Sequence, residues 1–287
     1  GLRTITKHTG WPSQGIVTWF DDAARFPAED AVDLSRTDIA RGRGGDTPDG
    51  DRRRTTIAVP MLSRIANFDD LDPLRLEPDV DVVMVPPGHA LPPADLVILP
   101  GTKATLADLA LFRTQGWELD LAAHVRRGGR VIGLCGGYQM LGRTITDPLG
   151  VEGPVETASG LGLLDIETVL ASDKVTRPVV GRHRETGTSV VGYEIHAGRT
   201  TGPDTGRPWL MLGDRPDGAQ SVDGRIIGSY VHGVFADDRF RAAFLAGLGV
   251  TSTLRYDDSI DATLDRWADH LEEQLDLEVV LSIAHRR

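Results

Sequence analysis

Cys135 is the only cysteine of this 287-residue chain, and it lies in a turn that is rich in glycine. The surrounding segment, GLCGGYQMLG over residues 133–142, follows the apolar residues Val131 and Ile132. A Gly-x-Cys-x-Gly pattern between a buried strand and a helix has the form of a nucleophile elbow with sulfur in place of oxygen. Glycines permit the strained torsions of such a turn, and the first amides of the helix favour a thiolate. The pattern predicts a nucleophilic cysteine, and the alternative is a buried structural cysteine.

A cysteine nucleophile needs a base, and histidine is the usual one. Of the eight histidines, His196 and His232 each end an apolar strand and have glycine or a small residue nearby. The strand within residues 228–235 (GSYVHGVF) would deliver His232 to the carboxyl edge of a sheet, where Cys135 is also expected. We predict His232 as the base. The alternative is a structural histidine with satisfied hydrogen bonds at a strand end.

Acyl transfer through a thioester is the chemistry that fits this pair. Cys135 would attack a carbonyl carbon, and His232 would take the thiol proton and return it to the leaving amine. The oxyanion needs amide donors, which we expect from Gly136, next to the nucleophile, and from Gly101 in the loop 100–103. Lys103 in that loop is an alternative partner for an anion, or simply a solvated lysine at the start of a helix.

The elements that must position these residues alternate between strands and helices. Strands are predicted at 56–60, 81–85, 95–100 and 130–132, with helices at 102–112 and 117–127. Such alternation implies a parallel sheet with helices on both faces, and ligands bind at the carboxyl ends of its strands. After residue 142 the pattern changes to shorter β segments at 163–170, 190–195, 209–212 and 225–231. A helix at 237–248 follows, and a last amphipathic helix carries Leu264, Trp267, Leu271 and Leu275 on one face.

Composition bounds the class of protein. The chain has 40% hydrophobic residues, a net charge of −11 and no apolar run near the ~20 residues of a membrane span. We therefore expect a cytoplasmic protein that binds neither membrane nor nucleic acid. A single cysteine excludes an internal disulfide and a cysteine-based zinc site, and no histidine or carboxylate cluster has the spacing of metal ligands. Because phosphate-loop and dinucleotide motifs are absent, we expect no nucleotide site in this chain.

Three regions are expected along the chain. Residues 1–40 contain one strand-like stretch, 15–20, which cannot build a core alone and should be buried against another element. Residues 41–54 are charged and rich in glycine and predict a linker, although their arginines could alternatively form a nucleic-acid patch. Residues 55–287 form the α/β domain. Because the sequence opens Gly1-Leu2-Arg3 without methionine, we expect a piece of a longer protein or a trimmed product.

The segment 133–142 resembles the nucleophile turn of class I glutamine amidotransferases of the cobyric acid synthase type. Four further stretches resemble that family in the same order. They are LSRIANFDDLDPL at 62–74, LPGTK at 99–103, GYEIHAGRT at 192–200 and YVHGVF at 230–235. The resemblance covers residues 55–275 and implies a flavodoxin-like α/β fold with a mainly parallel sheet and extra β segments. Residues 1–40 resemble the end of the ATP-dependent, dethiobiotin-synthetase-like half that precedes this domain.

The resemblance implies a glutaminase that serves an amide ligase. The family amidates carboxylates of adenosylcobyrinic acid a,c-diamide with ATP, Mg²⁺ and glutamine, which gives cobyric acid in cobalamin biosynthesis. This chain would hydrolyse glutamine at Cys135 and pass ammonia to the synthetase half. It would need no cofactor of its own, since ATP, Mg²⁺ and the corrinoid acceptor belong to that missing half. Gln139 and Arg177 match positions that the resemblance assigns to glutamine binding, with Arg177 near the carboxylate or, alternatively, simply on the surface.

One position departs from the pattern of many class I amidotransferases. Those enzymes carry a glutamate two residues after the catalytic histidine, where this chain has Val234, and the cobyric acid synthase branch also lacks it. Glu194 is the candidate that we expect to orient His232 instead. Two alternatives stay open for the function. One is the same chemistry for another acceptor, such as cobyrinic acid or a peptidoglycan lipid precursor, and the other is a catalytically silent binding module.

Overall fold

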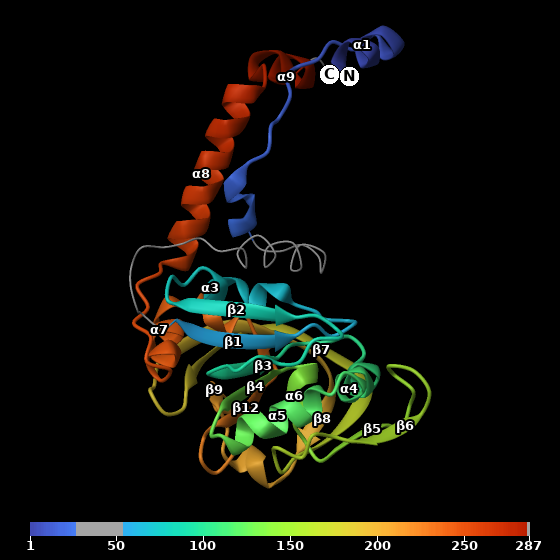
Figure 1. Cartoon of the computed structure of the whole chain (residues 1–287), viewed down its shortest axis with the longest axis vertical. Coiled ribbons are helices and arrows are strands. Elements are labelled where there is room, and N and C mark those ends of the chain that lie inside the picture. Colours follow the sequence, from blue (N-terminus) through green and yellow to red (C-terminus); the bar gives the residue numbers. More distant parts are fainter. Residues whose placement is uncertain (27–53, 286–287) are drawn as a thin grey trace. The chain divides into compact units, whose positions relative to one another are not determined.

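The apolar strands predicted from the sequence form one sheet in the computed structural model, which describes residues 1–26 and 54–285 (Figure 1). The sheet has the strand order β11-β12-β4-β3-β1-β2. Its strands are β1 (Thr55–Pro60), β2 (Val80–Val85), β3 (Leu96–Leu99), β4 (Arg130–Leu134), β11 (Ala219–Gln220) and β12 (Ile226–Ser229). All neighbouring strands are parallel except β11 and β12. The prediction of an α/β fold with a mainly parallel sheet is confirmed.

The middle of this sheet is apolar because its strands are covered on both faces. All four residues of β3 are buried, as are Val131 and Ile132 of β4. A strand with no polar alternation is typical of a parallel sheet that lies between helices. The helices and short helical turns of this part of the chain are η2 (Phe68–Asp70), α3 (Asp72–Arg75), α4 (Thr105–Thr114), α5 (Trp117–Arg126), α6 (Gly136–Met140), η4 (Val234–Ala236) and α7 (Asp238–Ala246).

A second, mainly antiparallel sheet follows the nucleophile turn. It contains β5 (Thr144–Asp147), β6 (Glu156–Ser159), β7 (Glu167–His183), β8 (Ser189–Thr201), β9 (Leu210–Leu212), β10 (Arg215–Asp217) and β13 (Val231–His232), with η3 (Pro203–Gly206) after β8. The strand β7 is longer than the predicted segment 163–170. Its polar residues 172–178 stay extended because they pair with β8 beyond a register shift between Val169 and Lys174, and pairing of the backbone needs no apolar side chains.

The described residues divide into two compact units. One contains residues 54–256, and the other contains residues 1–26 together with 257–285. The second unit holds α1 (Leu2–Thr9), η1 (Asp21–Arg25), most of α8 (Tyr256–Gln274) and α9 (Leu277–Ala284). The contacts thus group the C-terminal helices with the N-terminal segment, whereas the predicted domain 55–287 included them. Within the predicted linker 41–54, only Arg54 lies inside the described residues.

The buried strand that we predicted at residues 15–20 is wrong. Gly15 forms an isolated bridge with Leu275, and the side chains of Ile16, Val17 and Trp19 are exposed. Within the described parts of the chain this stretch has no further strand beside it, so its apolar residues have no sheet to cover. Among the same residues, no helix combines the length and the apolar composition that crossing a membrane would require.

A buried guanidinium holds the chain that follows β13. Arg241 of α7 pairs with Glu77 at 2.7 Å, and both side chains are buried. The same guanidinium donates to the carbonyl oxygens of Phe235 and Leu254 at 2.9 and 2.8 Å. Arg241 therefore ties the segment just after His232 to α3 and to the chain that leads into α8.

We predict that Arg241→Met lowers the free energy of unfolding by about 3–5 kcal/mol, because Glu77 would keep a buried and unpaired charge. Urea unfolding followed by circular dichroism measures the loss. Arg225→Met is the matched control, since Arg225 and Asp223 form an exposed pair that should contribute about 1 kcal/mol or less. Equal losses in the two variants would contradict the prediction.

Candidate active site

Cys135 occupies a strained turn between β4 and α6. Its φ and ψ of 50° and −108° are unfavourable for any residue with a side chain, and its N–H donates to the carbonyl of Ser229 in β12 at 2.8 Å. The turn has no room for side chains at the flanking glycines, since a Cβ at Gly137 would lie 2.1 Å from the carbonyl oxygen of Leu99. Close packing of the turn on β3 and β12 therefore holds the thiol at the carboxyl edge of the sheet, as predicted.

His232 is fully buried at the end of β13, and a carboxylate fixes its ring. Its Nδ1 lies 2.6 Å from Oδ2 of Asp70, and Oδ1 of the same carboxylate accepts the N–H of Gly233, also at 2.6 Å. Asp70 is itself buried in η2. Two donors thus hold both oxygens of one carboxylate, which fixes the ring and leaves Nε2 as its free nitrogen.

The free nitrogen of His232 faces the space that it shares with Cys135. Nε2 is buried and makes no hydrogen bond within the described residues. A Cβ built on Gly101 would lie 2.9 Å from Cε1 of His232 and 3.7 Å from Cβ of Cys135, so these three residues border one space. Sγ of Cys135 lies 3.3 Å from the carbonyl oxygen of Ile195, which accepts the S–H whenever the thiol is protonated.

Electrostatics in this space favour the protonated imidazole. Burial by itself would lower the pKa of His232, but the charge and hydrogen bond of Asp70, with a smaller contribution from Cys135, outweigh it and raise the pKa to about 10. At neutral pH the favoured state is therefore an imidazolium between the carboxylate of Asp70 and the sulfur of Cys135. Such a group can deliver a proton to a leaving amine.

A tyrosine clamps the segment that carries Asp70. The ring of Tyr193 in β8 stacks on His232, with centroids 5.5 Å apart and planes inclined by 22°. Its hydroxyl donates to Asp69 at 2.8 Å and accepts from Nδ2 of Asn67 at 2.9 Å. Burial raises the pKa of Tyr193, so the hydroxyl stays neutral and keeps its donor. The histidine ring and the loop that orients it are thus held by one side chain.

The predicted oxyanion residues lie beside the nucleophile. A Cβ on Gly136 would come within 3.2 Å of the backbone nitrogen of Thr102, so the loop after β3 packs directly on the start of α6. The carboxylate of Asp108 fixes this loop, because it accepts hydrogen bonds from Thr102 and from the backbone nitrogen of Ser63. The structure therefore brings Gly101 and Gly136 together around Cys135.

Gln139 is close to Cys135 in sequence, but its side chain is engaged inside the protein. Its Nε2 donates to the carbonyl of Ala197 at 3.1 Å and to the hydroxyl of Tyr230 at 3.2 Å. Its Oε1 accepts from Thr105 at 3.1 Å, and the whole side chain is buried. A role for Gln139 in holding glutamine would therefore be indirect, through the position of β8 at Ala197.

The predicted partner of His232 was wrong, because Glu194 does not contact it. In the antiparallel pairing of β13 with β8, His232 lies opposite Tyr193 and Glu194 lies opposite Val231. Successive residues of a strand point to opposite faces, so Glu194 faces away from the imidazole. Sequence analysis missed Asp70, although it lies in the family-like stretch 62–74. The missing acid at Val234 and two adjacent aspartates in that stretch were the available signals.

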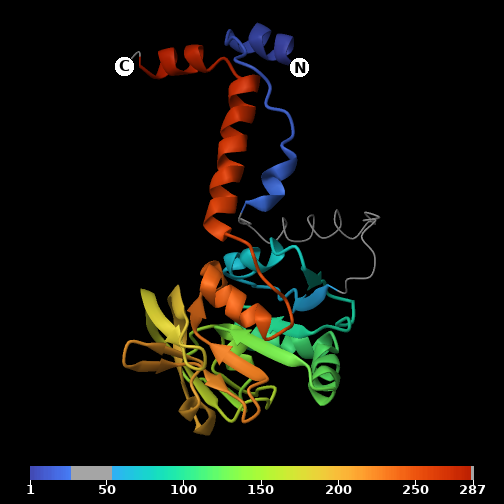
Figure 2. The same cartoon turned by 90° about the vertical axis from the view of Figure 1, so that its left-hand side faces the viewer.

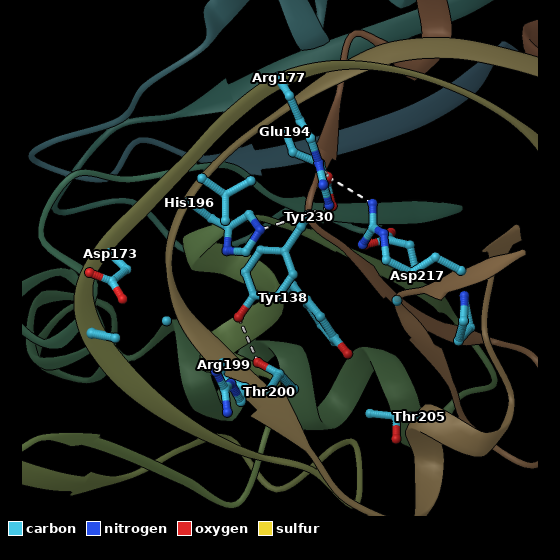
Figure 3. Close-up of a pocket in the computed structure, with 16 residues that line it drawn as sticks. Tyr138, Asp173, Arg177, Glu194, His196, Arg199, Thr200, Thr205, Asp217 and Tyr230 are labelled. Atoms are coloured by element: carbon cyan, nitrogen blue, oxygen red, sulfur yellow. Dashed lines mark hydrogen bonds and ion pairs between the residues drawn. The ribbon is translucent and has the colours of Figure 1, made fainter. Parts of the chain in front are cut away.

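Arg177 shares the face of Glu194, away from His232. Its Nε lies 2.7 Å from Oε2 of Glu194, which also accepts from Arg215 at 2.8 Å. Figure 3 shows these side chains bordering a cavity together with His196 and Tyr230. That cavity has a volume of about 660 Å³, and neither Cys135 nor His232 is among its lining residues. The structure therefore does not bring Arg177 together with the thiol and the imidazole.

No group of three or more histidine, cysteine, aspartate or glutamate side chains is arranged to hold a metal ion in the described ranges 1–26 and 54–285. The residues around Cys135 are instead a thiol, an imidazole, a carboxylate and glycine backbone. This set of groups suits nucleophilic attack on a carbonyl without a metal ligand set.

Comparison with known proteins places these residues in a family context. Residues 56–240 match the model of the CobB/CobQ-like glutamine amidotransferase domain. The chain is 56% identical over 285 residues to the cobyric acid synthase of Paracoccus denitrificans (strain Pd 1222), covering 99% of this chain and 57% of that protein. It is 54% identical to the cobyric acid synthase of Ruegeria sp. (strain TM1040), covering 99% of this chain and 56% of that protein. The chain thus spans a little over half the length of these relatives.

A solved structure supports the fold. A crystal structure of a glutamine amidotransferase aligns with a TM-score of 0.51 and 22% identity, covering 68% of this chain and 99% of that one.

We predict that Asp70→Asn lowers the pKa of His232, whereas Glu194→Gln leaves it unchanged. The ordinary histidine pKa is about 6.5, so protonation of His232 stabilises the folded state below that pH, and this contribution is lost as pH rises through about 10. NMR titration of the His232 ring, with unfolding measured at each pH, tests both variants. A shift caused by Glu194→Gln alone would restore Glu194 as the orienting residue.

A second prediction concerns the space beside Gly101. Gly101→Ala would place a methyl group 2.9 Å from the buried ring of His232, and should slow alkylation of Cys135 by iodoacetamide at pH 7 by roughly tenfold while the protein stays folded. Gly153→Ala is the control, because a Cβ there meets no atom within 4 Å. Similar alkylation rates for the two variants would show that Gly101 does not border the reactive space.

Proposed function

The chain belongs to the CobB/CobQ-like glutamine amidotransferase family, and from that premise we propose that it hydrolyses glutamine at Cys135 to supply ammonia. One observation carries this proposal. A thiol in a strained turn and a buried imidazole border the same space, and the imidazole is fixed through Nδ1 by Asp70 so that Nε2 is free. This is the geometry that thioester chemistry needs, with the base oriented by a third group.

In the proposed reaction the sulfur of Cys135 attacks the carboxamide carbon of glutamine. The amide oxygen becomes an oxyanion, for which the N–H groups of Gly101 and Gly136 are the proposed donors. Nε2 of His232 gives its proton to the nitrogen as the carbon–nitrogen bond breaks, so ammonia leaves and a thioester remains. Water then attacks the thioester, with the neutral imidazole as base, and releases glutamate and the thiolate.

Aspartate 70 acts in this scheme as a positioning group for the base. Its carboxylate keeps the Nδ1–H tautomer and stabilises the imidazolium, so that every proton transfer uses Nε2. Gln139 is proposed to act indirectly, by holding β8 at Ala197 next to the nucleophile. Arg177 is not assigned to the glutamine carboxylate, because it lies on the face of β8 opposite to His232.

The use of the ammonia is proposed from the relatives. We propose that it passes to an ATP- and Mg²⁺-dependent synthetase half and amidates carboxylates of a corrinoid, cobyrinic acid a,c-diamide, in cobalamin biosynthesis. The two relatives named above are cobyric acid synthases, and the chain matches nearly its whole length to them. ATP and the acceptor would bind outside this chain. We place the reaction in the cytoplasm, where a reducing environment keeps a catalytic thiol free.

We predict that a diazoketone analogue of glutamine labels Cys135 covalently, and that intact mass spectrometry of the protein followed by peptide mapping detects the adduct. Cys135→Ala should abolish labelling, and His232→Asn should slow it by roughly 10²–10⁴-fold because the proton donor is lost. His89→Asn is the control, since His89 is an exposed loop residue. A folded protein that shows no glutamine-dependent labelling would instead favour a silent binding module.

A further inference from the structure

The unit formed by residues 1–26 and 257–285 exposes an unusual amount of apolar surface. Of the twenty large apolar side chains that are exposed in the described parts of the chain, eleven belong to this small unit. They are Leu2, Ile5, Trp11, Ile16, Val17, Trp19, Leu264, Val279, Val280, Leu281 and Ile283. Apolar surface gathered in this way marks an interaction site, whereas scattered single residues do not.

The N-terminal segment is nevertheless held firmly along α8. Phe20 packs on Trp267 with ring centroids 5.0 Å apart, and the carbonyl of Thr18 lies 3.1 Å from Nε2 of His270. Asp22 pairs with Arg266 at 2.7 Å. Figures 1 and 2 both show the segment running beside α8, with α1 and α9 at the same end of that helix. These contacts order the unit without covering its exposed apolar residues.

The two terminal helices are the least covered elements. No residue of α1 or α9 is buried, although α9 is Leu-Glu-Val-Val-Leu-Ser-Ile-Ala and mostly apolar. Leu281 and Ile283 are 57% and 56% exposed, and Trp19 beside α8 is 81% exposed. A helix with so many exposed aliphatic residues gains stability when another surface covers it, because each buried side chain is removed from water.

We propose that α9, together with α1 and the stretch 11–19, is the docking surface for the synthetase half of the relatives, a partner that rests on the proposed function above. The relatives supply the material for this partner. The Paracoccus protein matches 99% of this chain, yet the match covers only 57% of that protein, so a large part of its length lies outside this chain. Contact with the synthetase half would also be needed to transfer ammonia without loss to solvent.

The proposal gives the C-terminal helices a role that differs from their place in the sequence. They follow the glutaminase residues along the chain, but they pack on residues 1–26, which precede those residues. Leu275 bridges to Gly15, and the N–H of Asp276 donates to the carbonyl of Gln14 at 2.8 Å. A surface made from both ends of the chain would link the glutaminase to its partner at two points.

The test measures binding directly, without glutamine. The part of the Paracoccus protein that has no counterpart in this chain is expressed separately, mixed with the full chain and followed by analytical ultracentrifugation and calorimetry. We expect a one-to-one complex, weakened roughly tenfold or more by the double substitution Leu281→Asp and Ile283→Asp. Ile5→Asp in α1 is a second variant on the same surface. Val222→Asp is the matched control, because Val222 is 87% exposed in the other unit and should not affect binding.

Three results would overturn the proposal: no complex, a complex that neither surface variant weakens, or self-association of the chain through α9 that the partner does not displace. Circular dichroism shows whether each variant is folded, and a loss of binding counts only for folded variants. Because labelling of Cys135 by the glutamine analogue is measured on the chain alone, failure of docking and failure of the glutaminase are separate outcomes.

Discussion

The carboxylate of Asp70 bridges two donors that would otherwise be buried without a partner, Nδ1 of His232 and the N–H of Gly233. Burial alone disfavours an imidazolium, so this arrangement exists only because a full negative charge lies 2.6 Å from the ring. The rest of the site depends on it. The same contact fixes the tautomer, the orientation of Nε2 and the charge that faces Cys135. Tyr193, Asp69 and Asn67 then hold the segment that carries Asp70 in place.

The alternation of side chains along β8 divides this region into two faces. Tyr193 lies on the face of His232, while Glu194 and its arginine partners lie on the other. The strand thus separates the reacting groups from the cavity lined by Arg177, His196 and Tyr230. Gln139 contacts the strand from its edge, through the carbonyl of Ala197, and also reaches Tyr230. A change on one face can therefore influence the other only through the backbone of β8 or through Gln139.

The two compact units pose different physical problems. In residues 54–256 the apolar strands are covered by helices and by the second sheet, and the buried pair Arg241–Glu77 anchors the chain after β13. The other unit has specific aromatic and ionic contacts along α8, but its terminal helices have no buried residue. A unit with ordered contacts and an uncovered apolar surface suits a piece that is completed by another part of a longer protein, as the length of the relatives suggests.

The sequence by itself determined the elements whose signals are local. The glycines around Cys135, the apolar strands before Gly101 and Cys135, and the position of His232 after a strand follow from nearby residues, and each lies at the sheet edge where it was expected. Only the tertiary structure decided which carboxylate reaches His232, because Asp70 and His232 are 162 residues apart and meet through packing of η2. The faces of Glu194 and Arg177 depended likewise on the register of β8 with β13 and β7, and a shift of one residue would exchange them. The pairing of the C-terminal helices with residues 1–26 also joins distant parts of the chain, and such contacts leave no periodicity in either segment alone.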